Sequence, residues 1–231
     1  MTIGFDVISD FYLQPGESIN WDGKSSSLYC IVAGNISYDL RTIKQTLTHL
    51  GQHYQGVFYC LGSNEYENTS NIEVRTNELI RLCAPIRNAV LLHQHVVIID
   101  GVAILGVNGW YGNTAPSASL EVEASIEQHR HEDINYLKSS IGRLQKHLDV
   151  NKILIVSNSV PGPELYFGQE PIHALGQIPV NIALEDDTEK KVSHWVYGTY
   201  DKTVDLTLNN IKYVNNGCYK KSPYWAKHIE V

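Results

Sequence analysis

Short apolar runs alternate with longer amphipathic stretches along most of this chain. Apolar runs of strand length occupy residues 3–9, 28–33, 56–61, 90–92, 96–99, 102–107, 152–156, 193–196, 203–208 and 211–214. Apolar positions at helical spacing predict helices over residues 38–53, 72–83 and 120–148. The apolar face expected for the last helix comprises Ile134, Leu137, Ile141, Leu144 and Leu148. This order predicts an α/β fold, with a sandwich of two sheets flanked by helices.

Three of the predicted strands end in the same way, with an apolar run, then glycine, then polar residues. Gly34 is followed by Asn35, Gly62 by Ser63 and Asn64, and Gly198 by Thr199. In open α/β sheets the ligand crevice lies beyond the carboxyl ends of the strands, and glycine there permits a sharp turn or a close backbone approach. The three strand ends therefore predict a crevice lined by polar side chains.

Composition narrows the class of protein. The 231 residues suit one domain over 1–231, and no lysine or arginine run within the net charge of −7 indicates a nucleic-acid surface. None of the four cysteines forms a C-x-x-C pair, which indicates a reducing compartment. The start of the chain lacks the features of a signal peptide, and no apolar stretch reaches the ~18 residues of a membrane span. We expect a soluble cytoplasmic protein.

The order of these strand ends resembles the calcineurin-like metallophosphoesterase family. Its motifs run Asp-x-His, Gly-Asp, Gly-Asn-His-Glu, a lone His after a strand, and Gly-His-x-His. Their counterparts here are Asp10-Phe11-Tyr12, Gly34-Asn35, Gly62-Ser63-Asn64-Glu65, Asn158 and Gly198-Thr199-Tyr200-Asp201. The tail from Val214 to Tyr219 also resembles the closing segment of the family. The resemblance covers nearly the whole chain and implies a four-layer αββα sandwich of two mixed sheets.

The same resemblance implies a site that has lost most of its metal ligands and its catalytic histidine. Family members hold two divalent metals through Asp, His and Asn ligands, with one bridging carboxylate, and a histidine protonates the leaving oxygen. Here the seven vestigial metal-site positions carry Asp10, Tyr12, Asn35, Ser63, Asn158, Thr199 and Asp201. Asn64 stands at the position of the catalytic histidine and cannot act as an acid or base near neutral pH. We therefore expect no catalytic residue and no dinuclear Mn, Zn or Fe site.

An oxygen-only cation site remains an alternative. Asp10 and Asp201, with the amide oxygens of Asn35 and Asn158, could hold a single hard cation such as Mg²⁺ or Ca²⁺. Such a site could support an active metal-dependent phosphoesterase that hydrolyses phosphomonoesters or phosphodiesters. A single cation would not recreate a two-metal clamp.

Several other residues admit a plain structural interpretation. Asp10 could cap a turn, and Glu65 could be an ordinary loop carboxylate. The pairs His93/His95 and His129/His131 lack a third metal ligand or a shared helix face, so we assign them no metal role. The aromatic loop over residues 109–112 and the proline-rich loop over 161–179 are candidate contact surfaces, with packing as the simpler interpretation of the first.

The favoured hypothesis is a catalytically inactive protein that uses the fold as a structural or protein-interaction module. Degenerate copies of this family are familiar from bacteriophages, so the resemblance is compatible with a phage-encoded protein in the cytoplasm of a bacterial host or in the virion. We expect protein partners, with oligomerisation as an option, and neither membrane nor nucleic-acid binding. A module that binds nucleotide or phosphate without hydrolysis is disfavoured, because no basic cluster lies near the crevice motifs.

Overall fold

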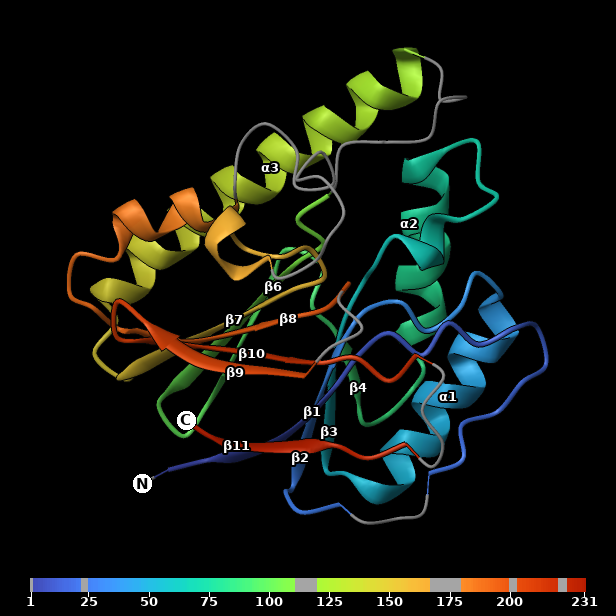
Figure 1. Ribbon diagram of the computed structural model, residues 1–231, viewed down its shortest axis with the longest axis horizontal. Helices are drawn as coiled ribbons and strands as arrows, with labels where there is room; N and C mark the ends of the chain where they lie inside the picture. Colours follow the sequence, from blue (N-terminus) through green and yellow to red (C-terminus); the bar gives the residue numbers. More distant parts are fainter. Residues whose placement is uncertain (1, 22–24, 111–119, 167–179, 200–202, 220–223) are drawn as a thin grey trace.

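The polypeptide forms two β-sheets that pack face to face (Figure 1). The computed structural model describes residues 2–21, 25–110, 120–166, 180–199, 203–219 and 224–231. The first sheet has the order β11–β1–β2–β3–β4, formed by Lys227–Glu230, Gly4–Ile8, Tyr29–Ala33, Gly56–Cys60 and Ala89–Leu91. The second has the order β5–β6–β7–β8–β10–β9, formed by His95–Ile99, Val102–Val107, Lys152–Ser157, Val192–Tyr197, Ile211–Asn216 and Thr203–Leu208.

Both sheets are mixed. Strands β1 to β4 are parallel, and β11 pairs with β1 in the antiparallel sense. In the second sheet β6, β7, β8 and β10 are parallel, while the edge strands β5 and β9 are antiparallel. Parallel strands place their carboxyl ends at one edge of a sheet, which creates the position for a crevice.

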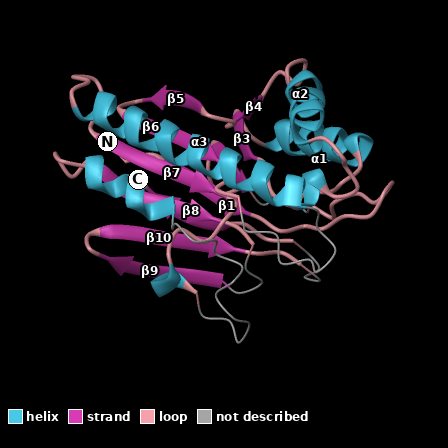
Figure 2. Cartoon of the chain, turned by 90° about the horizontal axis from the view of Figure 1, so that it is seen from above, coloured by secondary structure: helices cyan, strands magenta, loops and turns pink. Residues whose placement is uncertain are grey.

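Helices cover the outer faces of the sandwich. α1 (Leu40–His53) and α2 (Ile72–Cys83) cover the first sheet, and α3 (Leu120–Gln145) crosses the second (Figures 1 and 2). The helices α1 and α2 begin at side-chain caps, because Asp39 accepts from Thr42 N at 2.8 Å and Asn71 accepts from Val74 N at 2.9 Å. The described residues also form three short 3₁₀ helices, which are η1 (Asn64–Tyr66), η2 (Pro163–Leu165) and η4 (Val180–Asp186).

Three apolar clusters hold the four layers together. The central cluster lies between the sheets and includes Phe5, Ile31, Phe58, Leu154 and Val196, all at most 2% exposed. A second cluster joins the first sheet to α1 and α2, and a third joins the second sheet to α3 and η4. Burial on both faces of each sheet explains the continuous apolar runs in the sequence. The predicted αββα architecture is confirmed.

A tight hairpin turn lies at Asp100-Gly101. It joins the antiparallel strands β5 and β6, and its two residues have φ values of 45° and 85°. Positive φ at both central positions defines the turn type whose twist matches that of paired strands, and the Asp-Gly dipeptide favours it.

The expected end of the third helix was wrong. α3 ends at Gln145, and the following backbone turns tightly, with Lys146 N donating to Arg143 O and His147 N donating to Leu144 O. Leu148 consequently lies outside the apolar face and is 96% exposed, while Val150 takes a core position at 1%. The strand β11 was not predicted, because its sequence KHIE has no apolar run.

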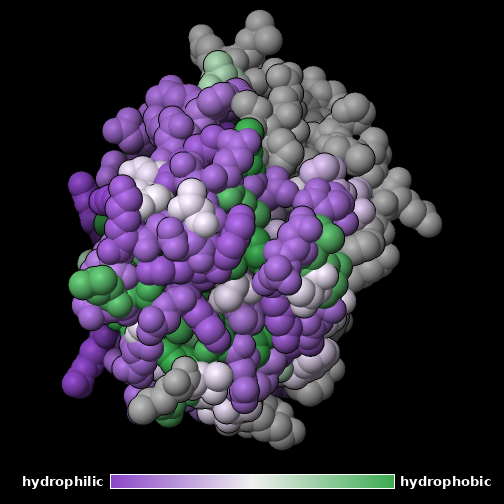
Figure 3. All heavy atoms as spheres, turned by 90° about the vertical axis from the view of Figure 1, so that its left-hand side faces the viewer, coloured by the Kyte–Doolittle hydropathy of each residue, from purple (hydrophilic) through white to green (hydrophobic). Residues whose placement is uncertain are grey.

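Figure 3 shows hydrophobic residues scattered among hydrophilic ones on the face that it presents. Within the described residues, no helix has both the length and the apolar character needed to cross a membrane.

Candidate functional site

The carboxyl ends of strands from both sheets meet in a cluster of polar residues, which occupies the predicted crevice position. Asp10 follows β1, Asn35 follows β2 and Ser63 follows β3 in the first sheet, while Asn158 and Thr199 follow β7 and β8 in the second. Asp10, Asn35 and Asn158 are at most 1% exposed. The structure therefore brings these predicted positions together, from parts of the chain up to 189 residues apart.

The Asn35 side chain lies at the centre of this crevice. Its Nδ2 donates to Asp10 Oδ1 at 2.8 Å and to Tyr12 OH at 2.9 Å. Its Oδ1 accepts from Asn64 N at 2.9 Å. Rotating the amide by 180° would place an oxygen against the Asp10 carboxylate and an amino group against a backbone N–H, so the neighbours fix its orientation.

Asn158 and Thr199 close the network from the second sheet. Thr199 Oγ1 donates to Asn158 Oδ1 at 2.7 Å, and the Asn158 amide donates to Ala33 O at 2.9 Å across the two sheets. Thr199 N donates to Asp10 Oδ1 at 2.9 Å. Ser63 N donates to Asn158 Oδ1 at 3.3 Å. The amide oxygens considered as cation ligands thus accept hydrogen bonds from the protein itself.

Backbone strain concentrates at the same positions. Asp10, Tyr12, Asn35 and Thr199 have φ values of 58°, 49°, 59° and 57°. Such left-handed conformations cost non-glycine residues on the order of 1 kcal/mol each and gather at functional sites of proteins. The crevice therefore keeps a demanding backbone geometry, which its hydrogen bonds and close packing hold in place.

Glycine is required where the two sheets approach each other. Gly34 has φ +83°, and a Cβ atom there would lie 2.7 Å from Asn158 Nδ2 and 2.9 Å from the Gly62 Cα. A Cβ on Gly198 would collide with the Ala33 carbonyl oxygen. The glycine frame noted in the sequence thus reflects contact of backbone with backbone across the crevice.

Glu65 anchors the loop below the crevice. Its buried carboxylate accepts from Ile36 N at 2.6 Å, Gly62 N at 2.8 Å and Asn35 N at 3.1 Å, and from Tyr59 OH at 2.8 Å. Burial raises the pKa of the Glu65 carboxyl, and the hydrogen bonds that it accepts oppose this rise. Glu65 ties the ends of β2 and β3 together, which is a larger role than that of an ordinary loop carboxylate.

The remaining predicted residues lie in different settings. Tyr12 contacts the ring of Tyr219 edge-on, with centroids 5.3 Å apart. Asn64 begins η1 and donates to Glu67 Oε2 at 2.8 Å. Asp10 accepts from Asn35 and Thr199 and does not cap a helix, since no helix of the described chain begins beside it. Asp201 lies outside the described residues, as does most of the proline-rich loop.

The donor set does not fit the two-metal centre of the family. A bridging ligand must offer negative oxygen to both cations, whereas Asn35 directs N–H toward the Asp10 carboxylate. Of the residues described at the crevice, Asp10 is the carboxylate and none is an imidazole. Throughout the described part of the chain, no three His, Cys, Asp or Glu side chains cluster to hold a metal.

Solved structures define the class of fold to which this arrangement belongs, a phosphoesterase-like sandwich. The chain resembles phosphopantetheinyl hydrolase from Mycobacterium tuberculosis, at 15% identity and a TM-score of 0.61, over 97% of this chain and 95% of the hydrolase. It also resembles the anchor in the inner membrane complex of Plasmodium, at 12% identity and a TM-score of 0.55, over 94% of this chain and 71% of the other.

A third similar structure is a Staphylococcus aureus protein assigned as a 5′-nucleotidase, with 12% identity and a TM-score of 0.54. The match covers 93% of this chain and 48% of that one. No protein-family model matches the sequence, and no curated protein matches it. At these identities the likeness shows the fold alone, which agrees with the four-layer architecture expected from the motifs.

Proposed function

We propose that this protein is a catalytically inactive member of the phosphoesterase-like fold that acts as a structural or protein-interaction module. The observation that carries the proposal is the amide of Asn35, which donates an N–H to Asp10 at the position where the family resemblance places a bridging carboxylate. This hydrogen bond compensates the buried Asp10 charge without a cation.

The crevice also offers little for acid–base chemistry. Hydrolysis of a phosphate ester needs a group that protonates the leaving oxygen and an activated water. Asn64 and Thr199 have no titratable side chain, and no imidazole occurs among the described crevice residues. The network instead stabilises contact between the two sheets, since Asn158 and Asp10 each bond to residues of the opposite sheet.

A role in protein contact is compatible with the neighbours of this fold. One of them is described as the anchor of a membrane complex, so the same sandwich serves in anchoring elsewhere. We extend that role to this chain as a proposal. Association with a bacteriophage or its virion remains a prediction from the resemblance, as does an oligomeric state.

A metal-dependent phosphoesterase is the second candidate, favoured by the retained Asp10 carboxylate at the end of β1 and by the hydrolase among the similar structures. Its cofactor would be a single hard cation held by oxygen ligands. We infer that the first candidate is the better one, because the oxygens of Asn35 and Asn158 already accept hydrogen bonds.

A hydrolysis assay separates the two candidates. The full chain is incubated with an aryl phosphodiester and an aryl phosphomonoester in the presence of Mn²⁺, Mg²⁺ or Ni²⁺, with Asp10→Ala as the matched variant. The proposal predicts the same background rate for both proteins with every metal. Turnover by the unmodified chain that is lost in Asp10→Ala would establish the phosphoesterase instead.

A further inference from the structure

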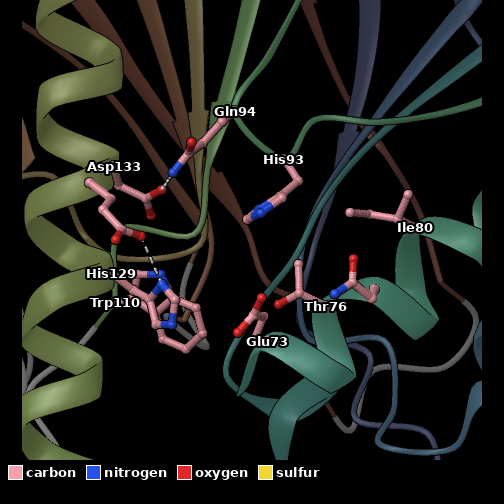
Figure 4. A pocket seen from close by; sticks show the side chains of 10 residues that line it. Glu73, Thr76, Ile80, His93, Gln94, Trp110, His129 and Asp133 are labelled. Atoms are coloured by element: carbon pink, nitrogen blue, oxygen red, sulfur yellow. Dashed lines mark hydrogen bonds and ion pairs between the residues drawn. The ribbon is translucent and has the colours of Figure 1, made fainter. Parts of the chain in front are cut away.

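A cavity separate from the polar crevice lies between the helices α2 and α3. It has a volume of about 240 Å³, and its walls come from α2, from the turn between β4 and β5, from Trp110 after β6 and from α3. None of the crevice residues discussed above lines it. Figure 4 shows the side chains that converge on this space from both helices.

The charges on the walls of this cavity are acidic. Glu73 approaches from α2, and Glu132 and Asp133 approach from α3, while the described residues of the lining include no lysine or arginine. No hydrogen bond or ion pair to the Glu73 carboxylate occurs among the residues that the structure describes. Three carboxylates around one space produce a negative potential that attracts cations and repels anions.

Asp133 is held in place before any ligand arrives. It is 1% exposed, and its carboxylate accepts from Gly109 N at 2.9 Å and from Gln94 Nε2 at 3.1 Å. Burial raises the pKa of Asp133 to about 6, and those two hydrogen bonds oppose the rise. The group is therefore mainly ionised at about pH 7.5, despite its burial.

His93 presents an unsatisfied nitrogen at the same place. Its Nδ1 is buried and has no hydrogen-bond partner in the described structure, and the imidazole points into the cavity in Figure 4. A buried polar atom without a hydrogen-bond partner is unfavourable, and a ligand that supplies a donor would remove this cost. Burial, and then the proximity of His129, lower the pKa of His93, which favours the neutral imidazole.

An aromatic surface completes the lining. Trp110 stacks with His129 at a centroid distance of 5.4 Å and contacts Tyr66 at 4.7 Å. His129 Nδ1 lies 3.0 Å from Glu132 Oε2, which orients that carboxylate beside the indole. Carboxylates next to an aromatic ring are suited to cations that carry several N–H donors on an organic body.

We propose that the cavity between α2 and α3 binds a small organic cation that carries an ammonium or guanidinium group. The cation donates to the carboxylates of Glu73, Glu132 and Asp133 and to the free Nδ1 of His93, while its carbon body contacts Trp110. This site is independent of the proposed function, because it requires nothing of the polar crevice.

The test titrates the full chain at about pH 7.5 with n-butylguanidinium and, as the anionic control, with butyrate at equal ionic strength. Binding is followed by calorimetry and by the indole N–H signal of Trp110 in nuclear magnetic resonance spectra. We expect saturable binding of n-butylguanidinium with a shift of the Trp110 signal, and no such response to butyrate.

Two variants on α2 locate the binding. Glu73→Gln should weaken the affinity about fivefold, whereas Glu78→Gln, on the same helix but outside the cavity, should leave it unchanged. Asn77→Phe should fill the cavity and abolish binding. The proposal is overturned if n-butylguanidinium gives no saturable response, if both glutamine variants weaken it equally, or if Asn77→Phe binds normally.

Discussion

At the scale of single residues, the crevice depends on one amide. Asn35 connects the Asp10 carboxylate, the Tyr12 hydroxyl and the Asn64 N–H, all within 2.9 Å of its side-chain atoms. Because the Asp10 side chain is buried, its charge needs donors, and the Nδ2 of Asn35 supplies one of them. Nothing else in the described crevice distinguishes it as sharply from a metal centre.

Asn35→Asp tests this dependence. The new carboxylate would face Asp10 Oδ1 across a distance of 2.8 Å, so we expect the free energy of unfolding to fall by about 3 kcal/mol near neutral pH. The two carboxylates would share a proton, which raises one folded-state pKa, so stability should recover as the pH falls. Urea unfolding at several pH values measures this effect.

Asn209→Asp is the matched control, since Asn209 is exposed in the turn between β9 and β10. It should unfold like the unmodified chain. An Asn35→Asp variant that unfolds at the same urea concentration as this control would contradict the role assigned to the amide.

Asp133 predicts a second dependence on pH. Since burial raises its folded-state pKa from 3.8 to about 6, the folded protein binds the proton more tightly than the unfolded chain does. The stability that this tighter proton binding contributes to the folded state is therefore fully present below about pH 4. It is lost as the pH rises through 6. This change in the pKa of Asp133 corresponds to ~3 kcal/mol.

The variant Asp133→Asn has no carboxyl group at this position, so it should not show this loss of stability with rising pH. Relative to the unmodified chain, the variant should gain stability between pH 4 and pH 7 by an amount on the order of 3 kcal/mol. The exposed Asp149→Asn should show no such trend. A difference between Asp133→Asn and the unmodified chain that stays constant with pH would refute the assignment.

At the scale of elements, the end of α3 is a boundary that the spacing of apolar residues does not predict. Leu144 and Leu148 are four residues apart and continue one helical stripe in the sequence, yet they are 7% and 96% exposed. The helix ends between them, and tight turns after Leu144 direct the chain to solvent before Val150 returns to the core. Capping and tertiary contacts decided this boundary, and neither is visible in apolar spacing.

The two leucines therefore predict opposite results. Leu144→Ala should lower the free energy of unfolding by about 2–3 kcal/mol, because it removes buried methyl groups from the cluster between α3 and the second sheet. Leu148→Ala should change it by less than about 0.5 kcal/mol. Thermal unfolding of both variants measures this difference. Equal destabilisation by the two substitutions would contradict the helix end at Gln145 and support a helix that extends to Leu148.

At the scale of the whole molecule, the sequence predicted what depends on local order. Apolar runs and the glycines at positions 34, 62 and 198 were sufficient for the architecture and for the location of the crevice. The direction of each hydrogen bond within the crevice was not predictable, because it depends on which side chains meet across two sheets. Glu65 illustrates this point, since its four donors come from two separate segments, residues 35–36 and 59–62.

The cavity between α2 and α3 was missed for the same reason. The spacing of His129 and His131 suggests a pair two positions apart, whereas the contacts of His129 are Glu132 on the next turn and Trp110 from another element. Glu73, His93 and Asp133 are far apart in the chain and come together only when both sheets have formed. A pattern search within one helix could not find them.

The central claim is that the crevice is stabilised by its own hydrogen bonds and holds no two-metal centre. Equilibrium dialysis of the full chain against Mn²⁺, followed by measurement of bound metal per chain, tests this claim most directly. Because Asn35 directs an N–H toward Asp10, we predict less than one tightly bound Mn²⁺ per chain. Tight binding of two Mn²⁺ per chain, lost in Asp10→Ala, would contradict the account.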